Sequence, residues 1–198
     1  MADRSPAPSV PEDTADLLRG RLRLCQPAEV SVVGQVSAGV ARALAEGGFS
    51  TRPAPDPDRR LLVLLHALPE WAGVLPGLLD RGCELWIIEA QPWGSLHRML
   101  RVLRPPRPDA PALIADLTAS GRADLRDLTR WEERFVFSGL PGFTEALMDQ
   151  GLTDAASLAA AGPDLRRAWR GQISPDPGGA ALLQPMICWT LAGGAPGR

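Results

Sequence analysis

Three apolar runs separated by helical segments constrain the fold of this chain more than any other feature of its sequence. The runs have the length and aliphatic content of buried strands, and they occupy 29–35, 61–68 and 83–90. Each is followed by a segment with apolar residues at helical spacing, at 37–48, 71–82 and 94–104. Strands that are apolar throughout are typical of a parallel sheet covered by helices on both faces. We therefore predict an α/β fold with a three-layer, Rossmann-like, mostly parallel sheet.

The remaining segments complete one predicted domain over residues 16–198. Residues 1–15 are polar and rich in proline, so we expect a mobile N-terminal tail there. The pattern predicts further strands at 111–117, 134–139 and 184–193. It predicts further helices at 16–24, 123–133, 143–152 and 157–169. Pro76 predicts a late start or a kink in the helix at 71–82, and Gly162-Pro163 predicts a break in the last helix.

Composition excludes several classes of protein. The 198 residues carry a net charge of −2, which argues against a protein built around nucleic acid. No window approaches the roughly 18 apolar residues of a transmembrane helix, and no signal peptide is visible. The three cysteines, Cys25, Cys83 and Cys188, are too widely spaced for a disulfide framework or a zinc motif. We expect a cytoplasmic protein that holds no metal and does not bind a membrane.

The turn after the first predicted strand is the first place to look for a ligand, because ligands of open parallel sheets bind beyond the carboxyl ends of the strands. The residues there that could cradle a cofactor are Gly34, Gln35, Ser37 and Gly39. The dinucleotide fingerprint would require glycine where this chain has Val36. Asp56 and Asp58 are the acidic residues at the distance expected for a ribose ligand. A tight strand-to-helix turn without any ligand would use the same glycines.

The order of predicted strands and helices resembles that of the class I S-adenosylmethionine-dependent methyltransferases. The nearest stretch is 61–90, in which a strand ends in a His-bearing loop and a second strand ends in Glu; the resemblance extends over about 29–193. It implies a Rossmann-like fold, S-adenosylmethionine as cofactor, and a ribose ligand in Asp56 or Asp58. The first motif of the family carries an acidic residue and closely spaced glycines, which this chain lacks.

A second resemblance is to the non-catalytic structural half of a polyketide synthase ketoreductase. It rests on a strand followed by Trp93, Gly94 and a helix that bears Arg98. That half has no cofactor site and supports a partner. The Ser-Tyr-Lys chemistry of the active half is impossible here, because the chain contains neither tyrosine nor lysine.

Few residues of the sequence are candidates for catalysis. His66 and Glu89 lie at the ends of predicted strands, where a histidine could act as a general base and a carboxylate could meet the same ligand. Glu70 also lies near the end of a predicted strand, and His97 lies in the first turn of the helix at 94–104. For each of these residues a solvated or hydrogen-bonded side chain is the simpler interpretation. No serine-hydrolase elbow, zinc-protease motif or C-x-x-C is present.

Two groups of side chains could bind a partner protein. Arg98, Arg101 and Arg104 share one stripe of the helix at 94–104, which could be a solvated face or a docking face for an acidic partner. Trp131 and Trp169 fall on arginine-rich segments predicted to be helical. If exposed they would be anchors for a partner, and if packed they would close a layer over the sheet. No aromatic residues are interleaved with the arginines, so we do not expect a nucleic-acid site.

These observations predict a degenerate, methyltransferase-like domain that acts as a non-catalytic structural or assembly partner of a larger protein. The altered first turn, the missing ribose acid and the scarcity of catalytic groups favour this interpretation, in which no cofactor is bound. The alternative is an active methyltransferase that transfers the methyl group of S-adenosylmethionine to a small molecule. A nicotinamide-dependent reductase is a third possibility, which the glycine spacing disfavours.

Overall fold

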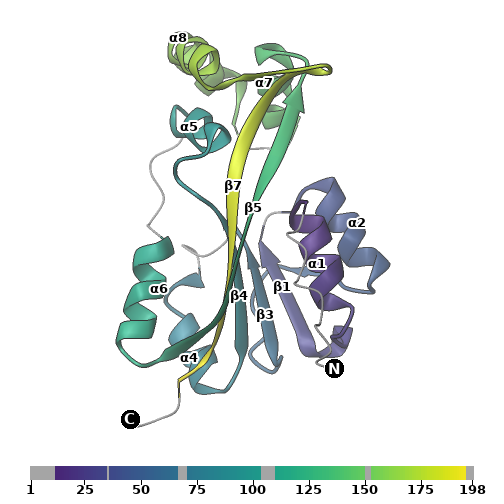
Figure 1. Cartoon of the computed structure of the whole chain (residues 1–198), viewed down its shortest axis with the longest axis vertical. Coiled ribbons are helices and arrows are strands. Elements are labelled where there is room, and N and C mark those ends of the chain that lie inside the picture. The colour runs from purple at the N-terminus through teal and green to yellow at the C-terminus, as the bar shows by residue number, and fades with distance from the viewer. Residues whose placement is uncertain (1–11, 35, 67–70, 104–109, 150–152, 195–198) are drawn as a thin grey trace, which may run out of the picture.

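The computed structural model describes residues 12–34, 36–66, 71–103, 110–149 and 153–194 (Figure 1). The helices are α1 (Thr14–Leu22), α2 (Ala38–Glu46), α4 (Leu75–Asp80), α5 (Ser95–Arg101), α6 (Ala110–Ala119), α7 (Leu140–Asp149) and α8 (Ala155–Gln172). The strands are β1 (Val30–Gly34), β2 (Thr51–Arg52), β3 (Leu61–Leu65), β4 (Glu84–Ala90), β5 (Ala123–Phe137), β6 (Ser174–Asp176) and β7 (Gly179–Gly193). None of the helices in these ranges is long and apolar enough to cross a membrane.

The strands form one sheet of seven, in the order β2-β1-β3-β4-β7-β5, with β6 paired to β7. The pairs β1–β2, β1–β3 and β3–β4 are parallel, whereas β7 is antiparallel to β4, β5 and β6. Six strands therefore point the same way and β7 alone points the opposite way. This confirms the predicted Rossmann-like, mostly parallel α/β sheet.

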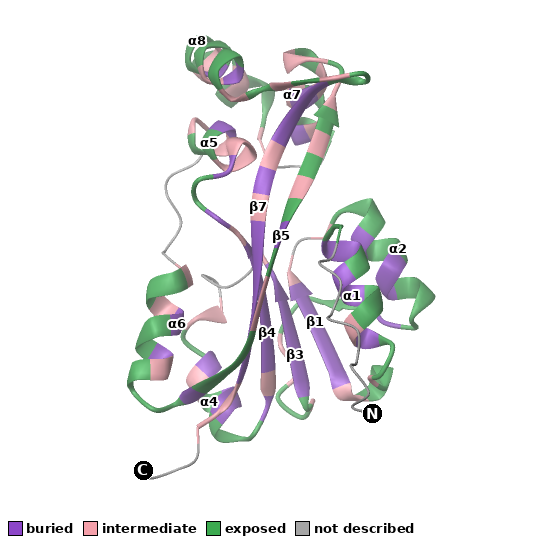
Figure 2. Ribbon diagram, in the orientation of Figure 1, coloured by how far each residue is buried: buried purple, intermediate pink, exposed green. Residues whose placement is uncertain are grey.

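Helices cover both faces of the sheet because successive strand residues point to opposite sides. Val32, Val63 and Ile88 pack with α1 and α2 in one hydrophobic cluster. Val33, Leu62 and Ile87 pack with α4 and α6 in a second cluster on the other face. The buried colour along β1, β3 and β4 in Figure 2 shows that these central strands lie between the two helical layers. The three-layer arrangement is as predicted.

The last two long strands extend beyond the rest of the sheet as a two-stranded arm (Figure 1). Their ladder runs from Ala123–Gly193 to Phe137–Ala180, whereas the pairing of β4 with β7 ends at Met186. The arm carries α5, α7 and α8, which we call the helical head. The head has a hydrophobic cluster of its own, in which the rings of Phe143 and Trp169 lie 5.6 Å apart.

Several predicted elements in the second half of the chain were wrong. The segment 111–117, predicted as a strand, is part of helix α6, because a short apolar run does not distinguish strand from buried helix. The segment 123–133, predicted as a helix, belongs to strand β5, whose ladder with β7 overrides local propensity. The predicted break at 162–163 does not occur: α8 continues through Pro163, which is exposed.

Thr14 and Ala15, predicted in the tail, are buried in α1; residues 1–11 lie outside the described ranges.

A buried glutamine fixes the chain that leads from β4 into the head. Gln184 on β7 is 2% exposed, and its side-chain amide donates to the carbonyl oxygens of Gln91 and Pro185, each at 2.9 Å. Its Oε1 accepts from the backbone N–H of His97 at 2.8 Å. Gly94 lies so close that an added Cβ would be 2.4 Å from the same oxygen. Segment 91–97 is therefore held against β7 by polar contacts that no apolar side chain could replace.

We expect Gln184→Leu to lower the free energy of unfolding by roughly 2–3 kcal/mol, because it removes three hydrogen bonds at a buried position, including the one donated by the backbone N–H of His97. Chemical denaturation followed by circular dichroism measures the change. Gln172→Leu is the matched control, since that amide is half-buried and makes only a 3.4 Å contact with Arg98. An equal loss in the two variants would contradict this account of Gln184.

Candidate functional site

The strand order reverses between β1 and β3, which defines the place where a ligand of such a sheet is expected. The chain passes from β1 to β2 on one side and then to β3 on the other. Gly34, the last residue of β1, is in register with Leu65, the last residue of β3. Beyond these carboxyl ends lie the turn into α2, the residue His66 and the end of β4. We call this region the switch-point site.

The turn after β1 uses its residues in structural roles. Gly34 has a φ of 125°, which only glycine adopts readily, and Ser37 caps α2 by accepting a hydrogen bond from the N–H of Val40 at 3.3 Å. Val36 is half-buried and packs against the hydrophobic cluster beneath α1 and α2. An added Cβ at Gly39 would meet Ser37 Oγ only at 3.9 Å, so this glycine is not required by close packing. Gln35 lies outside the described residues.

The predicted ribose ligands are not at the switch-point site. The backbone N–H of Asp56 donates to the hydroxyl of Ser31 at 3.2 Å, and Ser31 is near the amino end of β1. The loop after β2 thus returns along the sheet before it reaches Asp56 and Asp58. A hydrogen bond from Arg59 at 2.9 Å, together with one from the N–H of Asp58, lowers the pKa of Asp56. The carboxylate of Asp56 therefore stabilises this loop, and the backbone of Asp56 lies beside the amino end of β1 rather than beside the switch-point site.

Arg52 takes the place where an acidic residue was expected. It is the last residue of β2 and pairs with Val33, one residue before Gly34. Its side chain is exposed and its guanidinium lies 3.3 Å from Asp56. A cation at this position cannot accept hydrogen bonds from the two hydroxyls of a ribose.

The structure brings together the two candidate catalytic residues. His66 follows β3 and Glu89 lies near the end of β4; the imidazole Nδ1 is 3.7 Å from the carboxylate Oε2. Glu89 is 9% exposed, so its charge lies in the protein rather than in water. His66 has a φ of 53°, in the left-handed region that side chains other than glycine rarely adopt. Strained backbone of this kind is often found at functional sites.

A histidine can act as a general base, and a carboxylate near its ring can favour one orientation of the imidazole. The pair is therefore chemically able to act as a general base. The side chain of His66 is 31% exposed, so it is accessible from solvent. Nearby in the chain, the indole N–H of Trp71 is buried without a hydrogen-bond partner among the described residues. Glu70 lies outside them, and His97 is half-buried in α5.

The predicted partner-binding residues are only partly where they were expected. Arg98 and Arg101 are exposed on α5, and Arg104 lies outside the described residues. Trp131 is 5% exposed on β5 and Trp169 is 8% exposed in the core of the head, so neither can anchor a partner. Trp131 is not helical, and it packs beneath α1 because alternate residues of β5 face that helix.

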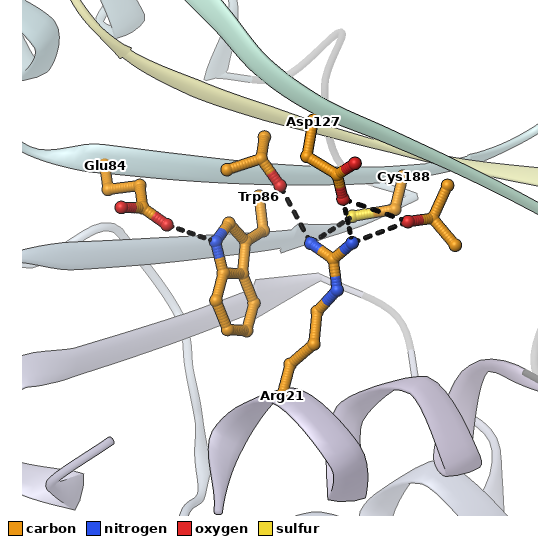
Figure 3. Close-up of polar contacts among 7 residues, drawn as sticks. Arg21, Glu84, Trp86, Asp127 and Cys188 are labelled. Carbon is orange, nitrogen blue, oxygen red and sulfur yellow. Dashed lines mark hydrogen bonds and ion pairs between the residues drawn. The ribbon is translucent and has the colours of Figure 1, made fainter. Parts of the chain in front are cut away.

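One constellation was not foreseen, because it joins residues from four distant segments. Figure 3 shows the guanidinium of Arg21 on α1 reaching the sheet, where it donates to Thr190 at 2.8 Å, to Thr129 at 2.6 Å and to Asp127. It also lies 5.5 Å from the ring centre of Trp86, within the range of a cation–π contact. No spacing along the sequence signals this group, since the register of β5 against β7 creates it. We call it the Arg21 clamp.

The thiol beside the clamp, Cys188, is fully buried and poorly suited to act as a nucleophile. Burial raises the pKa of Cys188 to about 12, and the sulfur lies 3.9 Å from the guanidinium of Arg21. Burial also raises the pKa of Cys83 to about 11. A thiol at such a pKa is almost entirely protonated near neutral pH. Among the described residues no three metal-binding side chains gather in one place.

A shallow cavity of about 320 Å³ lies between α1 and α2, away from the switch-point site. Its lining includes Leu22, Cys25 and Phe49, with the exposed ion pair of Arg19 and Glu46 beside it. It lies near the C-terminal end of α2, whereas the turn that follows β1 leads into the N-terminal end of that helix. The cavity is therefore separate from His66 and Glu89.

Comparison with known proteins adds little to this geometry. No family model matches the chain, and neither does any curated protein. Among solved structures, the chain is similar to a putative methyltransferase from Bacillus halodurans C-125, with 14% identity and a TM-score of 0.47, over 82% of this chain and 81% of that one.

We expect the Arg21 clamp to make stability depend on pH through Asp127. Burial alone would raise the pKa of Asp127, but hydrogen bonds from Arg21 and Thr129 outweigh it and lower the pKa below 3.8. The contribution to stability is present above that value and is lost as the pH falls through the lower folded-state pKa. The side chain is 52% exposed, so we expect at most about 1 kcal/mol.

The measurement is the free energy of unfolding of wild type and Asp127→Asn between about pH 7 and pH 2. The difference between the two proteins should be largest near neutrality and should shrink in acid. Asp124→Asn is the control, because it changes an exposed carboxylate on the same strand. A difference for Asp127→Asn that stays constant down to the lowest pH would contradict the assignment.

Proposed function

We propose that this chain is a degenerate, methyltransferase-like domain that does not catalyse methyl transfer and acts as a structural or assembly partner of a larger protein. The observation that carries the proposal is the position of the acidic residues. Asp56 is bound to Arg59 and lies beside the amino end of β1, and the cation of Arg52 stands at the carboxyl end of β2. No described carboxylate stands where a ribose would be held.

The turn after β1 also fits S-adenosylmethionine poorly. A cofactor-binding turn exposes backbone N–H groups through closely spaced glycines. Here Val36 supplies a branched side chain at the position of the missing glycine, and that side chain packs against the core. Ser37 uses its hydroxyl to cap α2, so it is already engaged. The residues present are those of a strand-to-helix turn.

The arm and the helical head support a role in assembly. They present long polar and apolar surfaces outside the layered core, and Figure 2 shows exposed residues along β5 and around α8. Three of the large apolar side chains that remain exposed belong to this region: Val136, Met148 and Ile173. Exposed apolar side chains beside charged ones are common in surfaces that bind other proteins.

Isothermal titration calorimetry of the folded full chain with S-adenosylmethionine tests the proposal, with NADPH as a parallel ligand. We expect no heat of binding from either ligand up to about 1 mM. Circular dichroism on the same sample shows that the protein is folded. Micromolar binding of S-adenosylmethionine would overturn the proposal, and tight binding of NADPH alone would favour a reductase.

A second candidate function is methyl transfer to a small molecule, and one observation favours it. At the switch-point site, Nδ1 of His66 lies 3.7 Å from Oε2 of Glu89. Such a pair could accept the proton that a hydroxyl or amine acceptor loses when it is methylated. Methyl transfer also depends largely on positioning, so it needs few catalytic groups.

The two candidates predict different results in one assay. S-Adenosylhomocysteine is measured after incubation of the full chain with S-adenosylmethionine and a panel of small alcohols, phenols and amines. We expect no product above the protein-free background. The second candidate instead predicts turnover that falls roughly 100-fold in Glu89→Gln. Glu132→Gln, an exposed carboxylate on β5, should leave that turnover unchanged.

A further inference from the structure

We propose that the outer edge of β5 pairs antiparallel with β5 of a second copy of this chain, in a register centred on Trp131. The pairing joins two sheets into one continuous sheet. It extends the assembly role proposed above by naming one partner, and it does not depend on whether the domain binds a cofactor.

Strand β5 has an edge available for such a pairing. It is the last strand in the sheet order, and β7 occupies one side of it over the full ladder. In the part of the chain that the structure describes, no strand lies against its other side. In the C-terminal half of β5 every second residue is exposed; these residues are Arg130, Glu132, Arg134 and Val136. An unpaired edge of this length is a template for another strand.

The charges on β5 favour pairing with β5 of a second copy of the chain. In an antiparallel pair about a twofold axis, centring on Trp131 places Arg130 opposite Glu132 of the second copy and Glu132 opposite Arg130 of the second copy. Opposite charges in directly facing positions stabilise a strand pair, and like charges destabilise it. A register centred one residue away would place Arg130 opposite Arg130 of the second copy, or Glu132 opposite Glu132 of the second copy. The Trp131 register is therefore favoured over the registers centred one residue away. A register centred on Glu133 would pair Glu132 with Arg134, but Arg134 already forms an ion pair with Asp176.

The exposed apolar residues of β5 agree with the same register. Leu125 is 46% exposed and Val136 is 44% exposed. They lie on the same face of the sheet, because their partners on β7, Leu191 and Ala181, are an even number of residues apart. The ladder is irregular between Leu125 and Asp127, which adds one residue at that point. Leu125 then comes beside Val136 of the second copy at each end of the pairing.

Charged residues on an edge strand usually prevent association. They do so because an incoming strand without complementary charges would place them in a partly buried position without partners. On β5 the neighbours in the central pairs have opposite signs, so a second copy supplies the missing partners. The same pattern therefore excludes unrelated apolar strands and admits this chain.

Sedimentation velocity on the full chain over a range of concentrations is the test. We expect a dimer that dissociates on dilution. Arg130→Glu and Glu132→Arg should each weaken dimerisation by roughly tenfold or more, because each places like charges in two facing pairs. The matched control is Arg167→Glu on α8, where the exposed guanidinium lies 3.5 Å from Asp164. It should leave the dimer unchanged.

Restoring the charges separates pairing from loss of structure. The double variant Arg130→Glu/Glu132→Arg should dimerise like wild type, since the two charges merely exchange places. A mixture of the two single variants should form a heterodimer, because each supplies the sign that the other lacks. Circular dichroism should show all variants folded, as both side chains are exposed.

A wild-type chain that is monomeric at every concentration would overturn the inference. A dimer that is insensitive to both single substitutions, or single variants that neither the double substitution nor mixing restores, would overturn it as well. These outcomes are independent of the calorimetric test. Binding of S-adenosylmethionine by a dimer would refute the non-catalytic role and leave the β5 pairing intact.

Discussion

The antiparallel pairing of β7 is the constraint on which the rest of the structure depends. On one side, β7 pairs with β4 as far as Met186; on the other, it pairs with β5 along the whole ladder. One strand therefore closes the parallel sheet, forms half of the arm and supports the head. Because it points against its neighbours, β7 leaves the head beyond the same end of the sheet as the switch-point site.

Polar contacts then fix how the helices lie against this framework. The Arg21 clamp ties the C-terminal end of α1 to β5 and β7, and Glu133 accepts a hydrogen bond from Thr14 N–H at the other end of that helix, at 2.7 Å. A carboxylate at a helix N-terminus and a cation near its C-terminus also match the helix dipole. Gln184 performs the same task for segment 91–97. Apolar burial would hold these elements in place, whereas the polar contacts determine their orientation.

The first half of the fold could be predicted from the sequence because each strand there is a continuous apolar run. In the second half, the strand segments at 134–139 and 184–193 and the helix at 157–169 were predicted. The first part of β5 was not, because its charged pattern is typical of an exposed helix and only the pairing with β7 makes it a strand. The residues of the candidate site also divide into those that the sequence could predict and those that it could not. His66 and Glu89 come together because both follow apolar runs whose ends lie at one edge of the sheet. The position of Asp56 could not be predicted, because its distance along the chain says nothing about the path of the loop. The role of Arg21 depends on a register that no local pattern encodes.

The long ladder of β5 and β7 also has a consequence for the order in which the molecule folds. The ladder can begin at Phe137 and Ala180, where the intervening chain is shortest, and extend toward Ala123 and Gly193. Loop closure favours this direction, because shorter loops cost less entropy. Until β7 has been synthesised, β4 keeps one edge unpaired, although β1, β3 and β4 are all available. A nascent chain would thus expose the open side of a hydrophobic sheet to the ribosome and to chaperones until its last strand emerges.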